Sequence, residues 1–325
     1  MGYIREGAVE ANGLQFFLAE AGEASDPAVI LLHGFPESWA SWRYQLPVLA
    51  ESGYHALAPE LRGYGASSAP PEVEAYSQRE LAADVAALIE ASGHEQAVVV
   101  GHDWGAALAW QVARLYPHRV SAVAGLSVPY GGPAPEPPTE TMRRRFGDFF
   151  FYMLYFQQPE VPEQELEADI RDSLRRIFHS LSADADPARI FAPRKDGGFL
   201  TGMEVPDEQP RWMREVDLDY YVSRFEQSGF RGPLNWYRAM DLYWEQTRNE
   251  PEDNWILRQP ALYIAGEQDP VYSLNRKAIK RMPRYLEDLR GQHIIPRCGH
   301  WTQMEQNYEV NRLLLGFLEE LAADR

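Results

Sequence analysis

Short apolar runs alternate with helical periodicity along the first part of the chain. Segments 28–32, 54–58, 97–100 and 120–126 are almost entirely apolar, and runs of this length are typical of strands buried on both faces. Before them, the extended segments 3–11 and 14–20 are joined by Asn12-Gly13, which favours a hairpin. Helical spacing follows the later runs, as after the capping box at 77–80. Strands that alternate with helices predict an α/β fold, a mostly parallel sheet with helices on both faces.

This alternation stops after Pro129. Four prolines within 133–138 break regular structure, and helical patterns rich in aromatic and charged residues follow, with helices predicted over 163–181, 218–228 and 234–248 and a loop over 193–207. Strand patterns return at 261–265 and 293–295, with helices predicted over 275–282 and 309–322. We therefore predict a core formed by residues 1–130 and 251–325. A helical cap at 131–250 would cover the carboxyl edge of the sheet, where open α/β sheets bind ligands.

Composition narrows the range of partners. The formal charge of −17 argues against nucleic acid and anionic membrane surfaces. The longest aromatic-rich run, 149–156, is far shorter than the ~20 residues that a membrane span needs. Cys298 is the single cysteine, so we expect no intrachain disulfide and a reducing, cytoplasmic setting. The histidines are scattered, so we expect no metal site. The oligomeric state stays open between a monomer and a homodimer.

The run 97–100 leads into the sequence GHDWGA at 101–106, and a helix that Pro117 ends follows. This strand–turn–helix pattern is a nucleophile elbow with aspartate where serine usually stands. A serine that attacked an alkyl carbon would form an ether, which water does not readily cleave, whereas a carboxylate forms an ester. An aspartate also needs no base to become a nucleophile. Asp103 therefore indicates displacement at an sp³ carbon, and the alternative is an aspartate that only caps the next helix.

An elbow nucleophile of this kind is followed along the chain by an acid and then a histidine. Asp269 follows the predicted strand 261–265 and His300 follows the strand 293–295, so both are expected at the same sheet edge as Asp103. His300 would activate water, and Asp269 would fix the tautomer of His300 and stabilise its charged form. The backbone N–H groups of Phe35 and Trp104 would form the oxyanion hole.

The sequence resembles the epoxide hydrolases of the α/β-hydrolase fold, including the soluble enzymes of animals and plants. The motifs that carry the resemblance span nearly the whole chain: HGFPESW at 33–39, RGYG at 62–65, GHDWGA at 101–106, LYFQQP at 154–159, NWYR at 235–238 and CGHWTQ at 298–303. The resemblance implies that two cap tyrosines, Tyr152 and Tyr237, hold the epoxide oxygen. A phenol can hydrogen-bond the alkoxide that ring opening leaves and then protonate it.

The resemblance also implies the reaction. A small hydrophobic epoxide and water would give a vicinal diol through an ester on Asp103, with no metal and no cofactor. Tyr155 shares a helix face with Tyr152 and is the alternative to it. We expect an apolar and aromatic pocket with walls drawn from Phe35, Trp104, Met153, Tyr155, Trp236 and Trp301.

Two positions depart from the family pattern. Glu60 stands where the family usually has aspartate, and we expect a local adjustment there without loss of function. Met153 stands where mammalian relatives have glutamine, which favours a more apolar cap side of the pocket.

Two other functions compete with this interpretation. Haloalkane and haloacid dehalogenases of the same fold also use an aspartate nucleophile, but a departing halide needs N–H donors and no phenols. Haloalkane dehalogenases tend to have a polar residue at the position of Phe35, and the haloacid enzymes tend to have arginine at the position of Trp104. Both positions, and the pair Tyr152 and Tyr237, favour the epoxide. The second alternative is a ligand-binding protein of this fold without turnover, against which the intact set Asp103, Asp269 and His300 argues.

Overall fold

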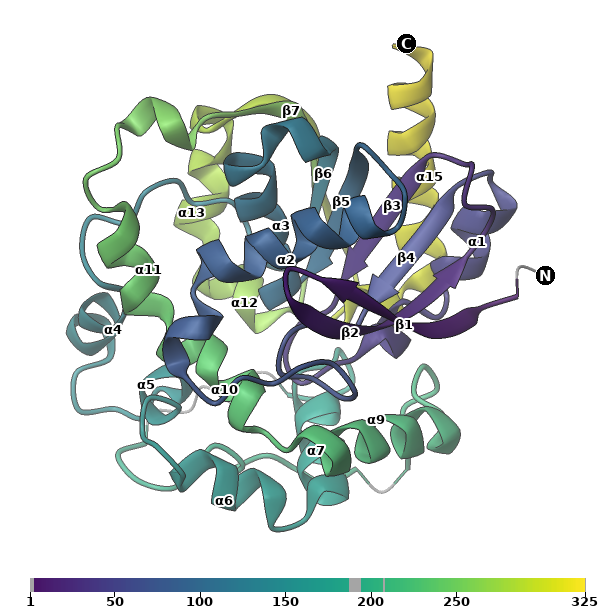
Figure 1. Cartoon of the computed structure of the whole chain (residues 1–325). Helices are drawn as coiled ribbons and strands as arrows, with labels where there is room; N and C mark the ends of the chain where they lie inside the picture. The colour runs from purple at the N-terminus through teal and green to yellow at the C-terminus, as the bar shows by residue number, and fades with distance from the viewer. Residues whose placement is uncertain (1–2, 187–193, 207, 325) are drawn as a thin grey trace.

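A single eight-stranded sheet organises the computed structural model, which describes residues 3–186, 194–206 and 208–324 (Figure 1). The strands lie in the order β1-β2-β4-β3-β5-β6-β7-β8. The hairpin β1–β2 and the pair β2–β4 are antiparallel, and the remaining neighbours are parallel. The strand bounds are β1 Arg5–Ala11, β2 Leu14–Ala21, β3 Ala28–Leu32, β4 His55–Pro59, β5 Ala97–His102, β6 Val120–Leu126, β7 Leu257–Gly266 and β8 Leu286–Ile295. The predicted α/β class and mostly parallel sheet are confirmed.

The central strands are buried because helices cover both faces of the sheet. Every residue of β3, β4 and β5 is buried, as the unbroken apolar runs predict. Figure 1 shows α2 and α3 across the front of the sheet, with α1 and α15 behind it. These and the short helices of the core have the following bounds: η1 Trp39–Trp42, α1 Leu46–Glu51, η2 Val73–Tyr76, α2 Gln78–Ala91, α3 Trp104–Leu115, η3 Pro117–Arg119, α12 Pro270–Leu274, α13 Arg276–Arg281, η5 Met282–Arg284, α14 Thr302–Glu305 and α15 Asn307–Ala323.

A series of helices lies between β6 and β7, along the left side and the bottom of Figure 1. Since β6 and β7 pair directly, with Leu126 opposite Ile264, this segment leaves the sheet and returns to it at neighbouring strands. Its described helices are α4 Pro138–Phe146, α5 Tyr152–Tyr155, α6 Val161–Glu167, α7 Ile170–Ser180, α9 Glu215–Ser228, α10 Arg231–Arg238, α11 Met240–Thr247 and η4 Glu252–Trp255. The ends of the predicted loop 193–207 fall outside the described residues.

Two helices predicted as continuous are each divided in two. The segment 163–181 breaks between α6 and α7, where Asp169 has an extended backbone and its side chain accepts a hydrogen bond from the Asp172 N–H. An aspartate in this role begins a new helix, which the apolar spacing of the segment does not reveal. The segment 234–248 breaks at Ala239, between α10 and α11. The helix predicted over 275–282 is confirmed as α13, Arg276–Arg281, and the separate helix α12 before it was not predicted.

None of the helices in the described ranges has both the length and the apolar character that a bilayer crossing requires.

Candidate active site

Asp103 lies on a sharp turn between β5 and α3, as the elbow pattern predicts. Its backbone is left-handed, with φ 51° and ψ −120°, a conformation that is uncommon for residues other than glycine and often marks a functional position. The following glycine is required by close packing, because a Cβ on Gly105 would overlap the carbonyl oxygens of Leu32 and His33. The turn therefore presses against the end of β3 and holds the Asp103 side chain at the carboxyl edge of the sheet.

The loop after β3 holds one oxygen of this carboxylate. The Phe35 N–H donates to Asp103 Oδ1 at 3.0 Å. A Cβ on Gly34 would lie 2.5 Å from the Asp103 Cβ, so glycine is needed for the loop to approach so closely. Trp104 is the first residue of α3, and its N–H as second donor stays a prediction. Because Phe35 occupies Oδ1, the second oxygen, Oδ2, is left to face the rest of the site.

His300 lies between the two aspartates that the sequence pairs with it. Its Nδ1 is 3.1 Å from Asp269 Oδ1, and its Nε2 is 3.7 Å from Asp103 Oδ2. Asp269 and His300 are both buried. Burial alone would lower the pKa of His300, but the charges of Asp269, Asp103 and Glu37 outweigh burial and raise this pKa to about 9. The structure thus brings together the three residues that the elbow order predicts.

Four of the predicted site residues line one cavity of about 50 Å³. Asp103, His300, Tyr152 and Tyr237 all line this cavity. The rings of the two tyrosines lie 6.1 Å apart, nearly perpendicular to each other. The rest of the lining is apolar: Phe35, Ile177, Leu181, Phe199, Pro270, Val271 and Leu274. A carboxylate and two phenols therefore share one enclosed, mostly apolar space.

Both phenols that line this cavity keep their protons. Burial, reinforced by the nearby Asp103 charge, raises the pKa of Tyr152 and of Tyr237 well above its usual value. A protonated phenol can donate a hydrogen bond and, to a strong base, a proton. Tyr155, the alternative to Tyr152, is absent from the cavity lining and lies against Phe150, with ring centroids 5.4 Å apart. The geometry therefore favours Tyr152.

The expected pocket walls differ from the observed lining, except for Phe35. Trp236 and Trp301 are core residues whose indole N–H groups donate to the carbonyls of Arg62 and Phe178 at 3.0 and 2.8 Å. Trp104 packs edge-on against Tyr237, with centroids 5.0 Å apart. These three residues and Met153 do not line the described cavity. Aliphatic residues such as Ile177 of α7 and Val271 of α12 take these places. Aromatic composition alone does not separate core from pocket.

Several buried polar residues support the site, and sequence reasoning did not select most of them. One carboxylate oxygen of Glu37 binds His102, and the other accepts a hydrogen bond from Gln303 at 3.1 Å. The second nitrogen of His102 lies 2.8 Å from the carbonyl oxygen of His300. Ser127, at the end of β6, donates to Asp269 Oδ2 at 2.6 Å. One signal could have found Ser127, since Asp103, Asp269 and His300 also follow a strand.

Glu305 holds the loop that carries His300. Its carboxylate accepts from the N–H groups of Gly299 and Trp301, on either side of the histidine, and of Ala183 beyond α7, at 2.9 to 3.0 Å. The His300 N–H donates to the Leu181 carbonyl at 2.8 Å. This loop is therefore tied to the helical segment as well as to the sheet.

Glu60, which departs from the family pattern, lies under the loop after β4. One of its carboxylate oxygens accepts from the Ala66 N–H at 2.8 Å and lies 3.6 Å from Arg224 of α9. Burial raises the pKa of Glu60 to about 7. Glu60 does not line the cavity, which agrees with a local adjustment.

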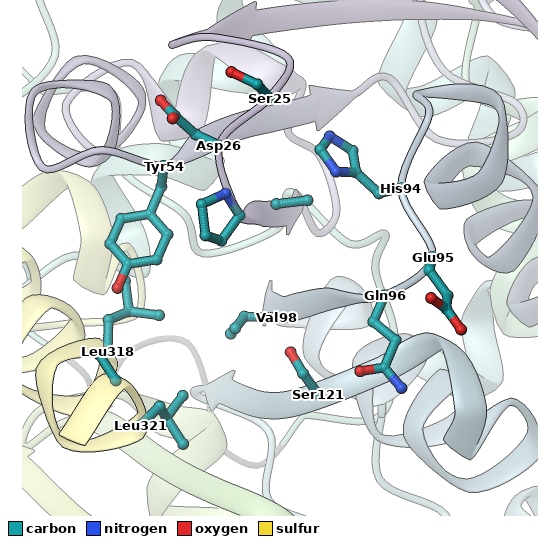
Figure 2. A pocket seen from close by; sticks show the side chains of 13 residues that line it. Ser25, Asp26, Tyr54, His94, Glu95, Gln96, Val98, Ser121, Leu318 and Leu321 are labelled. Atoms are coloured by element: carbon teal, nitrogen blue, oxygen red, sulfur yellow. The ribbon is translucent and has the colours of Figure 1, made fainter. Parts of the chain in front are cut away.

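A second hollow, of about 600 Å³, lies at the opposite edge of the sheet (Figure 2). Residues just before β3, β4 and β5 line it, among them Asp26, Tyr54 and His94, together with Ser121 of β6 and Leu318 of α15. His94 lies 2.8 Å from His55, which reaches Glu20 at 3.1 Å. This hollow holds none of the residues predicted for catalysis, so its size does not make it the reaction site.

This chain is similar to proteins of the alpha/beta hydrolase fold and to epoxide hydrolases in particular. A family described as the alpha/beta hydrolase fold matches residues 27–306. The chain is 43% identical to epoxide hydrolase A of Mycobacterium tuberculosis, over 99% of each chain. It is 41% identical to bifunctional epoxide hydrolase 2 of Sus scrofa, over 94% of this chain but 54% of that longer protein.

Solved structures that are similar to this chain are also epoxide hydrolases. Epoxide hydrolase A from Mycobacterium thermoresistibile superposes with a TM-score of 0.92 at 44% identity, over 98% of both chains. An epoxide hydrolase from an endophytic Streptomyces also reaches 0.92, at 39% identity, over 98% of this chain and 96% of that one.

Proposed function

Because this chain belongs to the epoxide hydrolases of the α/β-hydrolase family, we propose how its own residues divide the two steps of that reaction. The enzyme hydrolyses epoxides to vicinal diols. The observation that carries the assignment is the shared cavity, where Asp103, His300, Tyr152 and Tyr237 meet. The nucleophile, the base and two acids are thus within reach of one small substrate.

In the first step, Asp103 Oδ2 attacks a ring carbon and the bond from that carbon to the ring oxygen breaks. Phe35 already holds Oδ1 through its N–H, which supports Oδ2 as the attacking atom. The departing oxygen becomes an alkoxide, a far stronger base than a phenolate. Tyr152 and Tyr237 hydrogen-bond this oxygen and one of them protonates it. The resulting phenolate regains its proton from solvent.

In the second step, His300 takes a proton from water, and the hydroxide attacks the carbonyl carbon of the ester. The negative charge develops on Oδ1, where the Phe35 N–H already points. One donor of this kind typically contributes roughly 10²–10³ to the rate. The diol oxygen then leaves and takes the proton back from His300. Asp269 stabilises the charged imidazole through Nδ1.

Alkylation itself prepares His300 for this role. The Asp103 charge is one of the causes that raise the pKa of His300 to about 9 in the resting enzyme. Esterification removes that charge, so the pKa of His300 falls and the imidazole can lose its proton. The base is therefore released when the ester forms, which makes the order of the two steps a consequence of electrostatics.

This coupling predicts that the second step depends on pH much more strongly than the first. Below the pKa of His300 in the ester, decay of the ester should slow about tenfold per pH unit because the neutral imidazole is lost. Formation of the ester should change far less over the same interval. Quenched single turnovers, followed by intact-protein mass, measure both rates from about pH 5 to about pH 9. An ester decay rate that stays constant across this interval would contradict the role of His300.

A substrate comparison tests the assigned chemistry against the other two functions. Incubation with styrene oxide should give the diol, and incubation with 1-bromobutane should release no bromide, because two phenols serve an alkoxide and not a halide. Chromatography of the diol and a halide-sensitive assay read the two outcomes. Bromide release without diol would indicate a dehalogenase, and neither product would indicate a binding protein.

We also propose residues 131–250 as the cap. Tyr152 and Tyr237 both come from this segment and line the cavity over Asp103, which supports this assignment.

A reducing, cytoplasmic setting suits the cysteine of this chain. Cys298 is buried and free, and burial raises the pKa of its thiol.

A further inference from the structure

Ser127 occupies a strained position between the strands that carry the site. It follows β6 and is buried, and its φ of 71° places a residue other than glycine in the left-handed region. Its N–H donates to the Ile264 carbonyl and its own carbonyl accepts from the Tyr263 hydroxyl, each at 2.8 Å. Both partners belong to β7, the strand that leads to Asp269. Strain of this kind persists only where the surroundings fix it.

The Ser127 hydroxyl and the His300 ring contact different oxygens of the Asp269 carboxylate. It donates to Oδ2 at 2.6 Å, and among the described residues it is the hydrogen-bond donor to that oxygen. The other oxygen, Oδ1, accepts from the Val271 N–H at 2.8 Å and faces His300 Nδ1 at 3.1 Å. The Ser127 Oγ is also 3.2 Å from His300 Nδ1. One hydroxyl therefore touches both members of the acid–histidine pair.

We propose that Ser127 is a positioning residue, which holds the Asp269 carboxylate in the rotation that presents Oδ1 to His300. This inference rests on the proposed function, because it matters only if His300 activates water for the second step. Without the hydroxyl, Oδ2 would be buried with no donor, and a buried oxygen in that state favours rotation of the carboxylate toward any other N–H. His300 would then lose its fixed orientation.

The effect should fall on one step. Formation of the ester uses Asp103 and the phenols, which Ser127 does not contact in any described interaction. Decay of the ester uses His300 and Asp269. Rotation of the carboxylate would also take the negative charge of Asp269 Oδ1 away from His300. Loss of the hydroxyl should therefore move the pH midpoint of ester decay to lower pH.

Three variants separate the hydroxyl from the backbone strain. Ser127→Gly removes the hydroxyl and tolerates a positive φ. Ser127→Asn also tolerates this region and restores a donor through its amide. Ser121→Ala is the control, since Ser121 lies on the same strand but at the opposite sheet edge (Figure 2). All three are compared with the native enzyme by quenched single turnovers of styrene oxide across pH, with thermal unfolding to confirm folding.

We expect Ser127→Gly to slow ester decay about 10- to 100-fold, the range for a hydrogen bond to a charged partner, and to leave ester formation nearly unchanged. Ser127→Asn should recover most of the rate, and Ser121→Ala should match the native enzyme. The inference is overturned if Ser127→Gly decays at the native rate with the native pH midpoint, if both steps slow equally, or if Ser127→Asn is as slow as Ser127→Gly. Absence of any ester in the native enzyme would instead overturn the proposed function.

Discussion

Replacing His300 with asparagine is expected to trap the enzyme as its ester. Asp103 and the two phenols remain, so styrene oxide still alkylates the protein, but no base activates water. General-base catalysis typically contributes about 10²–10⁴ to the rate, so decay of the ester should slow by that factor. Intact-protein mass should rise by the mass of one substrate and stay there. Peptide mapping should place the added mass on Asp103.

The scaffold offers a matched control for this variant. His94 borders the hollow at the opposite edge of the sheet (Figure 2), so His94→Asn should turn over without accumulating a stable adduct. If His300→Asn stays unmodified and still produces diol, the covalent route through Asp103 is wrong.

The double variant Tyr152→Phe with Tyr237→Phe should show the second large effect, on formation of the ester. Without either phenol, the ring oxygen must leave as a bare alkoxide in an apolar cavity. Loss of acid assistance should slow alkylation by about 10² or more. Single-turnover mass spectrometry measures this rate directly, and each single variant should retain part of the assistance.

Tyr155→Phe is the internal control for that experiment. Tyr155 belongs to the same short helix as Tyr152 but does not line the cavity, so its loss should leave alkylation near the native rate. Alkylation at the native rate in the double variant would remove both phenols from the mechanism. A strong loss in Tyr155→Phe alone would shift the assignment to that residue.

The site residues at the edge of the sheet are predicted from the sequence far better than those of the helical segment. Asp103, Asp269 and His300 each follow a run that the apolar pattern marks as a strand, and the carboxyl ends of parallel strands share one edge. Simple topology therefore brings Asp103 together with Asp269 and His300, both more than a hundred positions further along the chain. The same reasoning predicts the sheet itself, since central parallel strands must be apolar on both faces.

The helical segment follows no comparable rule. Only the family resemblance indicates Tyr152 and Tyr237, because no pattern of spacing distinguishes them from other tyrosines packed in a core. The sequence predicts Trp236 and Trp301 in the pocket, but both donate their indole N–H groups to backbone carbonyls in the core. Its place after a predicted strand is one signal for Ser127, but an apolar pattern encodes neither its side-chain hydrogen bond nor its positive φ.

The position of the helical segment between β6 and β7 has an evolutionary consequence. The chain departs and returns at adjacent, directly paired strands, so this segment can be lengthened, shortened or exchanged without rethreading the sheet. The phenols that we assign to ring opening travel with the segment, whereas the nucleophile and its water-activating pair stay behind on the scaffold. Descendants of such a chain are free to diversify in which rings they open while inheriting the hydrolytic half intact.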